Sequence, residues 1–484
     1  MKQLLSRYRL EIIAALSGAV VMILELVGAR MMAPHFGTSM YVWTAMIGVI
    51  LGALSFGYWY GGNLADRGAS DKGLMYILAI AALFVAASLL LQADTLSYIA
   101  ALGLDTRVSA IVAATLLFAP ASALLGVVSP YVAKLKLSSL AHAGSSIGRL
   151  YAAGTLGSIA GTFLAGYWLI AWFGNFTLGI IVMVALIAIS FVAEHRTRVL
   201  TRIIGITAAT GLLLAAQQST PGIIADKDSA YARYQVSEQT DFRGQIRYLL
   251  MDNVGAQSGV IVGSYDALIF DYTQKFKALA DAYGSAERTL VIGGGAYTFP
   301  RVLAQERPEA RVDVVEIDPA LDAIATDYFG YTPVPNLNII HEDGRVFLNR
   351  NQSKYQLIYI DAFSSLTPPY QLATQQATRA MRESLVDDGI LAANVIAAPN
   401  ANDPYFTATL ATYRSVFADV DVYQVQGSLT MAQRQNLLFV MGDKPALAKL
   451  SSAPLGSRVD VLPESGGVLT DDHAPVEQLI QASE

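Results

Sequence analysis

The chain has 484 residues, of which 54% are hydrophobic and only 15% are charged, and its mean hydropathy is +0.42. A soluble domain carries about 25% charged residues, so this composition predicts a membrane-embedded part joined to a soluble part. The net charge of -6 and the lack of a long basic stretch exclude nucleic acid as an expected partner, and the absence of cysteine excludes disulfides, thiolate metal sites and cysteine nucleophiles.

Apolar stretches of about the length needed to cross a bilayer fill the first half of the chain. They cover residues 11–32, 41–61, 74–92, 108–133, 150–171, 175–193 and 200–216. We therefore expect residues 1–218 to form an all-α transmembrane bundle of about seven helices embedded in a lipid bilayer. The basic N-terminus resembles the start of a signal peptide, but the first apolar run is long and more spans follow, so we expect it to be retained as a helix.

The distribution of Lys and Arg between the stretches predicts an orientation. These residues precede the first stretch and follow the second, fourth and sixth, where they are Lys2, Arg7, Arg9, Arg67, Lys72, Lys134, Lys136, Arg149, Arg196, Arg198 and Arg202. Positive charge gathers on the cytoplasmic side, so the N-terminus is expected in the cytoplasm of a bacterial-type inner membrane. Seven spans would then place the soluble part on the periplasmic side, and one span more or fewer would reverse this.

Two charged residues of the first stretch are candidates for a function of the bundle itself. Glu25 lies about 20 Å along the helix, deep enough that it should face protein or water, and a transport role competes there with a purely structural one. Arg30 lies near the membrane interface, where its side chain can extend to the headgroups. Small residues at helical spacing predict close helix packing, and they are Gly48, Gly52, Gly57, Gly61, Gly157 and Gly161.

The second half of the chain has the pattern of a soluble domain. Residues 219–228 are predicted to be a linker, residues 229–287 a small β element, and residues 288–484 an α/β Rossmann-like domain in which strands and helices alternate around a largely parallel sheet. The last two expected strands have no helix between them, which predicts a closing hairpin. The expected strands are Tyr231–Val236, Ile246–Met251, Thr289–Ile292, Val312–Ile317, Leu337–His341, Leu357–Asp361, Ile390–Val395, Val420–Val425 and Leu437–Met441, and the clearest helices are Pro319–Phe329 and Leu372–Leu385.

Glycines and carboxylates follow successive strands of this predicted sheet. In an open α/β sheet such residues converge on the crevice where ligands bind, although single glycines also serve as turns and single carboxylates as helix caps. The last position of a dinucleotide-binding G-x-G-x-x-G is Thr298, which favours a nucleoside site over a dinucleotide site. The residues concerned are Gly293, Gly294 and Gly295 after the first strand, Glu316 at the end of the second, Asp343 after the third and Asp361 after the fourth.

From about Ser229 onward these motifs make the chain resemble the spermidine synthases (polyamine aminopropyltransferases), which share the class I methyltransferase fold. The resemblance implies that Glu316, in Val-Val-Glu-Ile-Asp, binds ribose and that Asp343, in Glu-Asp-Gly-Arg, lies on the adenine side. It implies a catalytic role for Asp361 and a nucleoside contact for Gln257. The glycine loop matches the family's Gly-Gly-Gly-Asp-Gly in its first three positions, and Tyr272 falls near the family's active-site tyrosine.

The first half and the last residues resemble a membrane-anchored branch of the same family. The matching stretches are Glu25-Leu-Val-Gly-Ala-Arg30, Ala33-Pro-His-Phe-Gly37, Gly57-Tyr-Trp-Tyr-Gly-Gly62, Gly148-Arg-Leu-Tyr-Ala-Ala-Gly-Thr-Leu-Gly157 and Leu469-Thr-Asp-Asp-His-Ala-Pro-Val-Glu477. His473 in the last stretch has no second histidine at ligand spacing, so we expect no metal site. The resemblance leaves a homodimer open.

Three positions depart from the family pattern in a consistent direction. Ala296 and Ser364 stand where the family has Asp, and Gln274 stands where it has Glu. Each loss removes an anionic contact to a cationic substrate, worth about 1.5–3 kcal/mol for a charge-assisted hydrogen bond, which argues against ordinary conversion of putrescine to spermidine.

The expected function is a membrane-bound enzyme of the spermidine synthase type, a transferase that holds no permanent cofactor. It would use S-adenosylmethionine or its decarboxylated form as co-substrate, release methylthioadenosine, and transfer an aminopropyl-type group or cleave the sulfonium, with a polyamine as a further ligand. The alternative is a transporter or sensor whose soluble domain binds a nucleoside or polyamine without chemistry. A methyltransferase on the same fold is a third reading.

Overall fold

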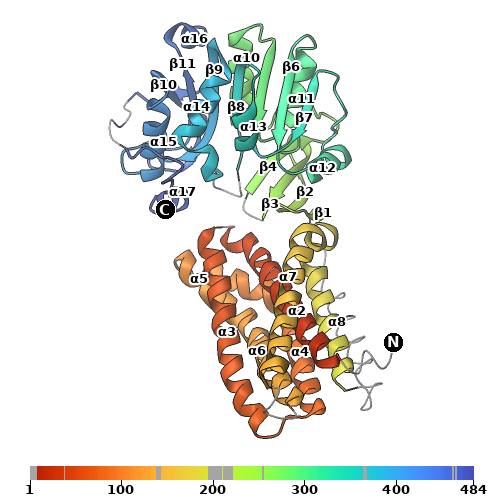
Figure 1. Cartoon of the computed structure of the whole chain (residues 1–484). Helices are drawn as coiled ribbons and strands as arrows, with labels where there is room; N and C mark the ends of the chain where they lie inside the picture. Colours follow the sequence, from red (N-terminus) through yellow and green to blue (C-terminus); the bar gives the residue numbers. More distant parts are fainter. Residues whose placement is uncertain are drawn as a thin grey trace. The chain divides into compact units, whose positions relative to one another are not determined.

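The computed structural model describes residues 8–37, 39–137, 143–194, 210, 222–252, 255–363, 368–460, 463 and 466–483. The chain divides into two compact units, one of Met1–Pro221 with Lys227–Arg233 and the other of Gly222–Asp226 with Tyr234–Glu484. The first unit is mainly helical and its helices are coloured red to yellow in Figure 1; the second contains the larger sheet and most of the smaller one and is coloured mainly green to blue. Each unit is described separately.

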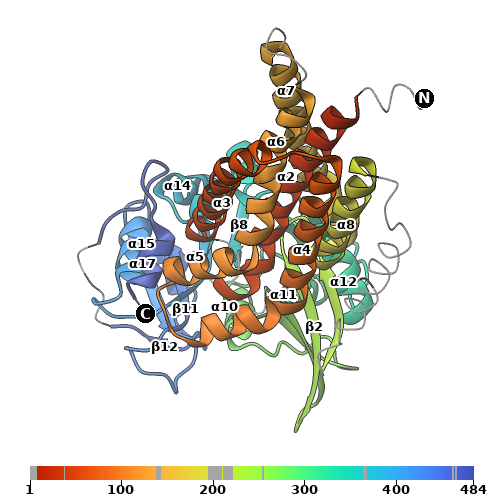
Figure 2. The same cartoon turned by 90° about the horizontal axis from the view of Figure 1, so that it is seen from below.

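The helical unit consists of apolar helices, some of which begin with a polar cap. The side chains of Ser39 and Ser70 accept hydrogen bonds from backbone amides in the first turns of α3 and α4, as N-caps do. Helix α2 contacts all the other helices of the unit, and Figure 2 shows it among them. The elements are α2 (Arg9–Phe36), α3 (Met40–Asp66), α4 (Asp71–Ala101), α5 (Thr106–Leu117), α6 (Ala119–Lys136), α7 (Ala143–Leu164), the π-helix η2 (Ala165–Leu169) and α8 (Ile170–Ala193).

Several of these helices could cross a membrane, as the sequence predicts. Within the described ranges, four are long and apolar enough by themselves, namely α2, α3, α4 and the part of α8 from Trp172 to Ala193. The predicted stretch 108–133 is instead two helices, α5 and α6, that meet at a 57° bend beside Pro120. The stretch 150–171 is helical but is not among the candidate spans, and the stretch 200–216 lies almost entirely outside the described residues.

The glycine pairs do not all serve close packing. A Cβ added to Gly57 would lie 2.1 Å from the Ala123 carbonyl oxygen, and one added to Gly157 would lie 1.8 Å from the Ala15 oxygen, so α3 touches α6 and α7 touches α2 at backbone distance. Gly48 and Gly52 have no atom within 4 Å of such a Cβ. The prediction of intramolecular packing is therefore wrong for this pair, because the pair lies on an exposed face of α3.

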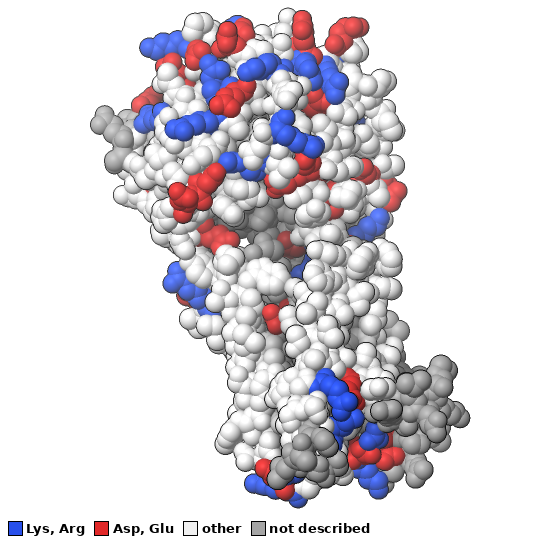
Figure 3. All heavy atoms as spheres, viewed as in Figure 1, with Lys and Arg blue, Asp and Glu red and all other residues white. Residues whose placement is uncertain are grey.

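Charged residues of the helical unit gather at the helix ends, and the sides of the helices are mostly uncharged in Figure 3. At one end, Arg9 pairs with Asp71 at 2.6 Å, Lys134 pairs with Asp66 at 2.7 Å, and Lys136 pairs with Glu11 at 3.0 Å. The basic members of these pairs belong to the set that the positive-inside rule places in the cytoplasm.

The α/β unit contains two sheets (Figure 1). The smaller has the strand order β1-β2-β3-β4, and the larger has the order β12-β10-β11-β9-β8-β5-β6-β7. Neighbours from β7 to β9 are parallel, whereas β11 is antiparallel to both β9 and β10. The strands are β1 (Ile223–Asp228), β2 (Arg233–Asp241), β3 (Gly244–Met251), β4 (Gly255–Ile261), β5 (Arg288–Ile292), β6 (Arg311–Glu316), β7 (Leu337–His341), β8 (Tyr355–Ile360), β9 (Leu385–Ala397), β10 (Asp419–Gln424), β11 (Gln435–Gly442) and β12 (Ser457–Arg458).

Helices cover both faces of the larger sheet. As a result, successive residues of its central strands are buried. On one face Tyr359 of β8 packs against Phe276 and Phe299; on the other, Ile358 belongs to a core with Phe347 and further residues of α13 to α15. The helices are α10 (Asp271–Tyr283), α11 (Thr298–Glu306), α12 (Ala320–Tyr328), α13 (Gly344–Arg350), the 3-10 turn η3 (Tyr370–Leu372), α14 (Gln375–Glu383), α15 (Pro404–Arg414), α16 (Lys444–Ala448) and α17 (Val476–Gln481).

The observed order confirms the predicted α/β fold. Every expected strand appears within a few residues of its predicted bounds, both expected helices are present as α12 and α14, and β10 and β11 form the expected hairpin. Two strands of the smaller sheet, β1 and β4, have no counterpart in the prediction, and β1 begins inside the predicted linker.

Candidate active site

The glycine loop joins β5 to α11 through backbone conformations that favour glycine. Gly293 has φ 94° and Gly295 has φ 53°, and the next helix begins directly after Tyr297. A Cβ added to Gly293 would lie 2.4 Å from the carbonyl oxygen of Asp361, and one added to Gly295 would lie 2.5 Å from Ser258 Oγ. The loop is therefore pressed between the end of β8 and strand β4, where only glycine fits.

Glu316 ends β6 and holds the glycine loop by its backbone. Its Oε2 accepts a hydrogen bond of 2.8 Å from the Gly294 amide, and its Oε1 accepts one of 2.9 Å from the Asp318 amide. Burial raises the pKa of Glu316, and the backbone amide donors act against that rise. A carboxylate has about four acceptor sites, and the backbone amides of Asp318, Gly294 and Gly295 act on this one, so the group keeps capacity for a ligand hydroxyl.

Asp343 follows β7 and caps helix α13. Its Oδ1 accepts hydrogen bonds from the amides of Arg345, at 2.8 Å, and Val346, at 3.0 Å. Its Oδ2 accepts a hydrogen bond of 3.3 Å from Gln371 Nε2. The sequence allows Asp343 to be either a helix cap or a ligand contact. In the structure Oδ1 acts as the helix cap, and Oδ2 contacts the side chain of Gln371 on η3.

Asp361 follows β8 and lies at the centre of a side-chain network. Its Oδ1 accepts a hydrogen bond of 3.0 Å from Asn394 Nδ2, and the Tyr272 hydroxyl is hydrogen-bonded to the same carboxylate. Burial raises the pKa of Asp361 to about 7, although both hydrogen bonds favour the ionised form. Burial and the neighbouring Asp361 carboxylate also raise the pKa of Tyr272 well above its usual value, so Tyr272 stays a neutral donor.

Asn394 is a residue that sequence reasoning missed. It is buried in β9, next to β8, and its Oδ1 accepts a hydrogen bond of 2.9 Å from Asn436 Nδ2 on β11. That contact fixes the orientation of the Asn394 amide, so its nitrogen points at Asp361. A polar residue within the apolar run Leu391-Ala-Ala-Asn-Val-Ile396 was the signal that could have identified it.

Strand β4 brings Gln257 to the same place. The Gln257 carbonyl oxygen would lie 3.8 Å from a Cβ on Gly295, and the neighbouring Ser258 Oγ accepts a hydrogen bond of 3.0 Å from the Ala296 amide. Ser258 was also missed by sequence reasoning. The structure therefore gathers Gln257, the three glycines, Glu316, Asp343, Asp361 and Tyr272 around the carboxyl ends of β5 to β8.

The three residues that depart from the family pattern carry no negative charge, and the structure describes the surroundings of two of them. Ala296 is a fully buried residue of the loop between β5 and α11. Gln274 is exposed, and its Nε2 donates a hydrogen bond of 2.9 Å to the Leu268 carbonyl. Ser364 lies outside the described residues.

Arg345 links α13 to a turn far along the sequence. Its Nη2 donates to Asp471 Oδ2 at 2.8 Å, and its Nη1 donates to the Gln371 carbonyl at 3.1 Å. Thr374 Oγ1 donates to Asp471 Oδ1 at 2.7 Å. This network holds η3, and with it Gln371, beside Asp343.

The remaining sequence candidates lie elsewhere. Glu25 and Arg30 belong to the helical unit, where Arg30 Nη1 donates a hydrogen bond of 2.9 Å to the Ala230 carbonyl. His473 is exposed and bridges to Thr470 through its backbone. Within the described ranges, no three His, Asp or Glu side chains are placed to hold a metal ion.

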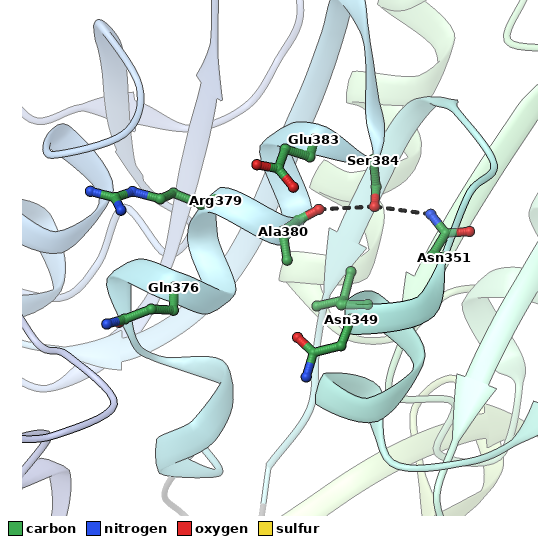
Figure 4. Close-up of a pocket in the computed structure, with 8 residues that line it drawn as sticks. Asn349, Asn351, Gln376, Arg379, Ala380, Glu383 and Ser384 are labelled. Atoms are coloured by element: carbon green, nitrogen blue, oxygen red, sulfur yellow. Dashed lines mark hydrogen bonds between the residues drawn. The ribbon is translucent and has the colours of Figure 1, made fainter.

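A separate polar pocket lies between α13 and α14 (Figure 4). Asn351 donates a hydrogen bond of 2.9 Å to Ser384 Oγ, which itself donates one of 2.9 Å to the Ala380 carbonyl. None of the predicted site residues lines this pocket. Its walls are Leu348, Asn349, Asn351, Gln376, Arg379, Ala380, Glu383 and Ser384.

Comparison with known proteins assigns the α/β unit to a family. Residues 274–439 match the family described as the spermine/spermidine synthase domain. A polyamine aminopropyltransferase of Vibrio vulnificus is 32% identical over 206 residues, which cover 42% of this chain and 67% of that protein. The chain belongs to the polyamine aminopropyltransferase family.

A further relative and a solved structure are also similar to this chain. A probable polyamine aminopropyl transferase of Bifidobacterium longum is 29% identical over 195 residues, 40% of this chain and 42% of the relative. The crystal structure of a probable spermidine synthase from Corynebacterium glutamicum is 20% identical and covers 50% of this chain and 91% of that one, with a TM-score of 0.41. The helices of the first unit lie outside the matched family domain.

Proposed function

We propose that this protein is a membrane-bound enzyme whose α/β unit binds an S-adenosyl nucleoside and catalyses an aminopropyl-type transfer or a cleavage of the sulfonium. The observation that carries the proposal is the Asp361 carboxylate, which is hydrogen-bonded to Tyr272 and Asn394 at the end of β8, where the backbone carbonyl of Asp361 lies against Gly293 of the glycine loop. A carboxyl with a pKa near 7 is suited to accept a proton at neutral pH. Membership of the aminopropyltransferase family supports the same reaction class.

In the proposed reaction, Glu316 holds the ribose hydroxyls, with Gln257 and the Asp343 side of the site holding the base. An acceptor amine attacks the aminopropyl carbon bonded to the sulfonium sulfur. The carbon–sulfur bond breaks, its electron pair stays on sulfur, and neutral methylthioadenosine leaves. The amine proton passes to Asp361. In the sulfonium-cleavage variant a nucleophile within the donor replaces the amine, and methylthioadenosine is again the nucleoside product.

The acceptor is proposed to differ from a simple diamine. Ala296 is fully buried and Gln274 is neutral, so two positions that carry acids in the family offer no negative charge here. A diamine with two ammonium groups would lose about 1.5–3 kcal/mol at each missing charge-assisted contact. We therefore expect putrescine to be a poor acceptor.

The test is methylthioadenosine release by the full-length protein in detergent or nanodiscs. The protein is given S-adenosylmethionine or its decarboxylated form, each with and without putrescine, and the nucleoside products are separated and quantified. We expect methylthioadenosine from one donor and a loss of about 100-fold or more in Asp361→Asn, the usual range for a general base. Asp388→Asn, on an exposed pair with Lys449, is the matched control.

Three results would decide against the proposal. S-adenosylhomocysteine as the sole nucleoside product would identify a methyltransferase. Binding of methylthioadenosine without any turnover would identify a sensor or transporter domain. Neither binding nor turnover, with Asp361→Asn indistinguishable from the parent protein, would remove the nucleoside site altogether.

A further inference from the structure

Glu25 is an ionisable residue in the middle of α2, a helix apolar enough to cross a bilayer. Its side chain is partly buried and forms no hydrogen bond or ion pair with any residue in the described ranges. Glu11 on the same helix differs, because it pairs with Lys136 at 3.0 Å. The charge of Glu25 therefore has no protein cation to balance it in the part of the chain that the structure describes.

The direction of the Glu25 side chain follows from the helical repeat. Residues seven positions apart lie on the same face of a helix, so Glu25 points to the same side of α2 as Gly18, two turns earlier. Gly18 faces α7: a Cβ added there would lie 2.4 Å from the Gly154 carbonyl oxygen and 2.9 Å from Ser158 Oγ. Glu25 thus points toward the side of α2 that α7 and its continuation occupy.

The register between the two helices then gives the level of Glu25. Helices α2 and α7 run in the same direction, because Gly157 packs on Ala15 and Gly161 packs on Ala19. Continued at the same offset, this register places Glu25 level with Tyr167, the middle residue of η2. A π-helical turn is rare and often marks a functional site, since its wider winding leaves a backbone carbonyl without the usual α-helical partner.

A third polar group lies at this level on α6. Glu25 and Ser122 are the same number of residues from the Lys136–Glu11 pair, which places both about 21 Å from it along antiparallel helices at 1.5 Å per residue. Ser122 is fully buried, and its hydroxyl has no hydrogen-bond partner in the described part of the chain. A carboxylate, a π turn and an unpartnered hydroxyl therefore occupy one level of the helical unit.

We propose that Glu25 is a binding site for a small monovalent cation within the helical unit. An ionised carboxylate is strongly unfavourable in apolar surroundings unless a cation or a proton neutralises it. The Ser122 hydroxyl and the carbonyls of η2 would serve as neutral oxygen ligands. The cation is a proton, a sodium ion or the ammonium group of an amine, which share the requirement for a carboxylate and neutral oxygens. This site is independent of the nucleoside site.

The test uses the full-length protein in lipid nanodiscs and a hydrophobic carbodiimide, which modifies protonated carboxyl groups in apolar surroundings. Mass spectrometry of the digested protein quantifies the adducts at Glu25 and, as an internal control on the same helix, at Glu11. We expect modification of Glu25 to exceed that of Glu11 by about tenfold or more at mildly acidic pH. Above the pKa of Glu25, modification should fall by about tenfold for each pH unit.

Competition at constant pH and ionic strength identifies the cation. Protection by sodium chloride but not by choline chloride identifies sodium, protection by putrescine identifies an ammonium ligand, and dependence on pH alone identifies the proton. Equal modification of Glu25 and Glu11, or modification of Glu25 that none of the three conditions changes, would overturn the proposal. Modification is measured on the wild-type protein, so the test does not depend on the folding of a variant. Methylthioadenosine release by Glu25→Gln is a separate measurement that reports on the nucleoside site.

Discussion

The amide nitrogen of Asn394 lies 3.0 Å from Oδ1 of Asp361, and the amide oxygen of Asn394 accepts a hydrogen bond from Asn436. Three strands therefore contribute to the environment of one carboxylate: β8 precedes Asp361, β9 carries the donor, and β11 orients that donor. Since the hydrogen bond favours the ionised carboxylate, we expect Asn394 to influence the proposed reaction through the pKa of Asp361.

Asn394→Ala should move the pH profile of methylthioadenosine release to higher pH. In the parent protein the rate should rise with pH through about 7, as Asp361 loses its proton and becomes a base. Removing a hydrogen bond to the charged form raises the pKa, by about one unit for a bond worth 1.5 kcal/mol. Asn402→Ala, at an exposed position, should leave the profile in place. If the rate of methylthioadenosine release is lower in Asn394→Ala at every pH but its pH dependence is not shifted, Asn394 has a purely structural role.

The raised pKa of Asp361 also predicts how stability depends on pH. Between about pH 4 and pH 7 the folded chain holds the Asp361 proton while the unfolded chain has released it, so the free energy of unfolding should fall as pH rises through this window. In Asp361→Asn this contribution is absent, and the stability of the variant relative to the parent should increase from pH 4 to pH 7. Thermal unfolding in detergent at a series of pH values measures the difference. Parallel curves for the two proteins would contradict a raised pKa.

Glu316→Gln should weaken nucleoside binding, because both carboxylate oxygens accept backbone hydrogen bonds. A glutamine amide has one oxygen, so one of the two backbone amides would face another donor. A loss of 1.5–3 kcal/mol corresponds to about a tenfold to 150-fold higher dissociation constant for methylthioadenosine, measured by calorimetry. Glu309→Gln, on an exposed position, is the control. Unchanged affinity in Glu316→Gln would remove Glu316 from the ligand site.

Asp471→Asn should weaken nucleoside binding through Arg345. The Arg345–Asp471 pair is partly exposed, with side chains 16% and 46% accessible, so its loss should amount to about 0.2–1 kcal/mol, or up to about a fivefold higher dissociation constant. The adjacent Asp472→Asn is the matched control, since Asp472 is exposed and outside the network. If the two variants bind methylthioadenosine equally well, the network does not position Gln371 and Asp343 for the ligand.

Gly157→Leu should destabilise the helical unit far more than Gly48→Leu. At Gly157 a side chain meets the Ala15 backbone, which cannot give way without moving α2 from α7, whereas at Gly48 nothing lies within reach. The unfolding temperature in detergent, followed by helix signal in circular dichroism, compares the two. Equal temperatures would show that the α2–α7 contact is not close in solution.

The strands and the order of the acidic residues were predictable, because apolar periodicity and the glycine loop are local patterns. The contact of Asn394 with Asp361 was not predictable. It depends on the pairing of β8, β9 and β11, and these strands lie far apart in the chain. The glycine pairs illustrate the same limit: Gly48–Gly52 and Gly57–Gly61 have the same spacing on one helix, but only the second pair meets a neighbouring helix. The spacing of two glycines shows that they share a face of the helix, but only the tertiary arrangement determines whether another helix packs on that face.

The sequence shows which acidic residues of the family pattern are absent, but it does not show the surroundings of the neutral residues that replace them. Ala296 is buried, and its amide donates a hydrogen bond to the Ser258 hydroxyl on β4, a strand that was not predicted from the sequence. Asp343 was ambiguous for a different reason, because an aspartate at a strand end suits a helix cap and a ligand contact equally well.

The ion pair between Arg345 and Asp471 joins residues 126 positions apart. A ribosome adds about 5–20 residues per second, so Arg345 emerges some 6–25 s before its partner is made. During that interval the segment with Gln371 lacks the turn that holds it beside Asp343. The adenine side of the proposed nucleoside site would therefore be completed late in synthesis, well after the glycine loop has been made.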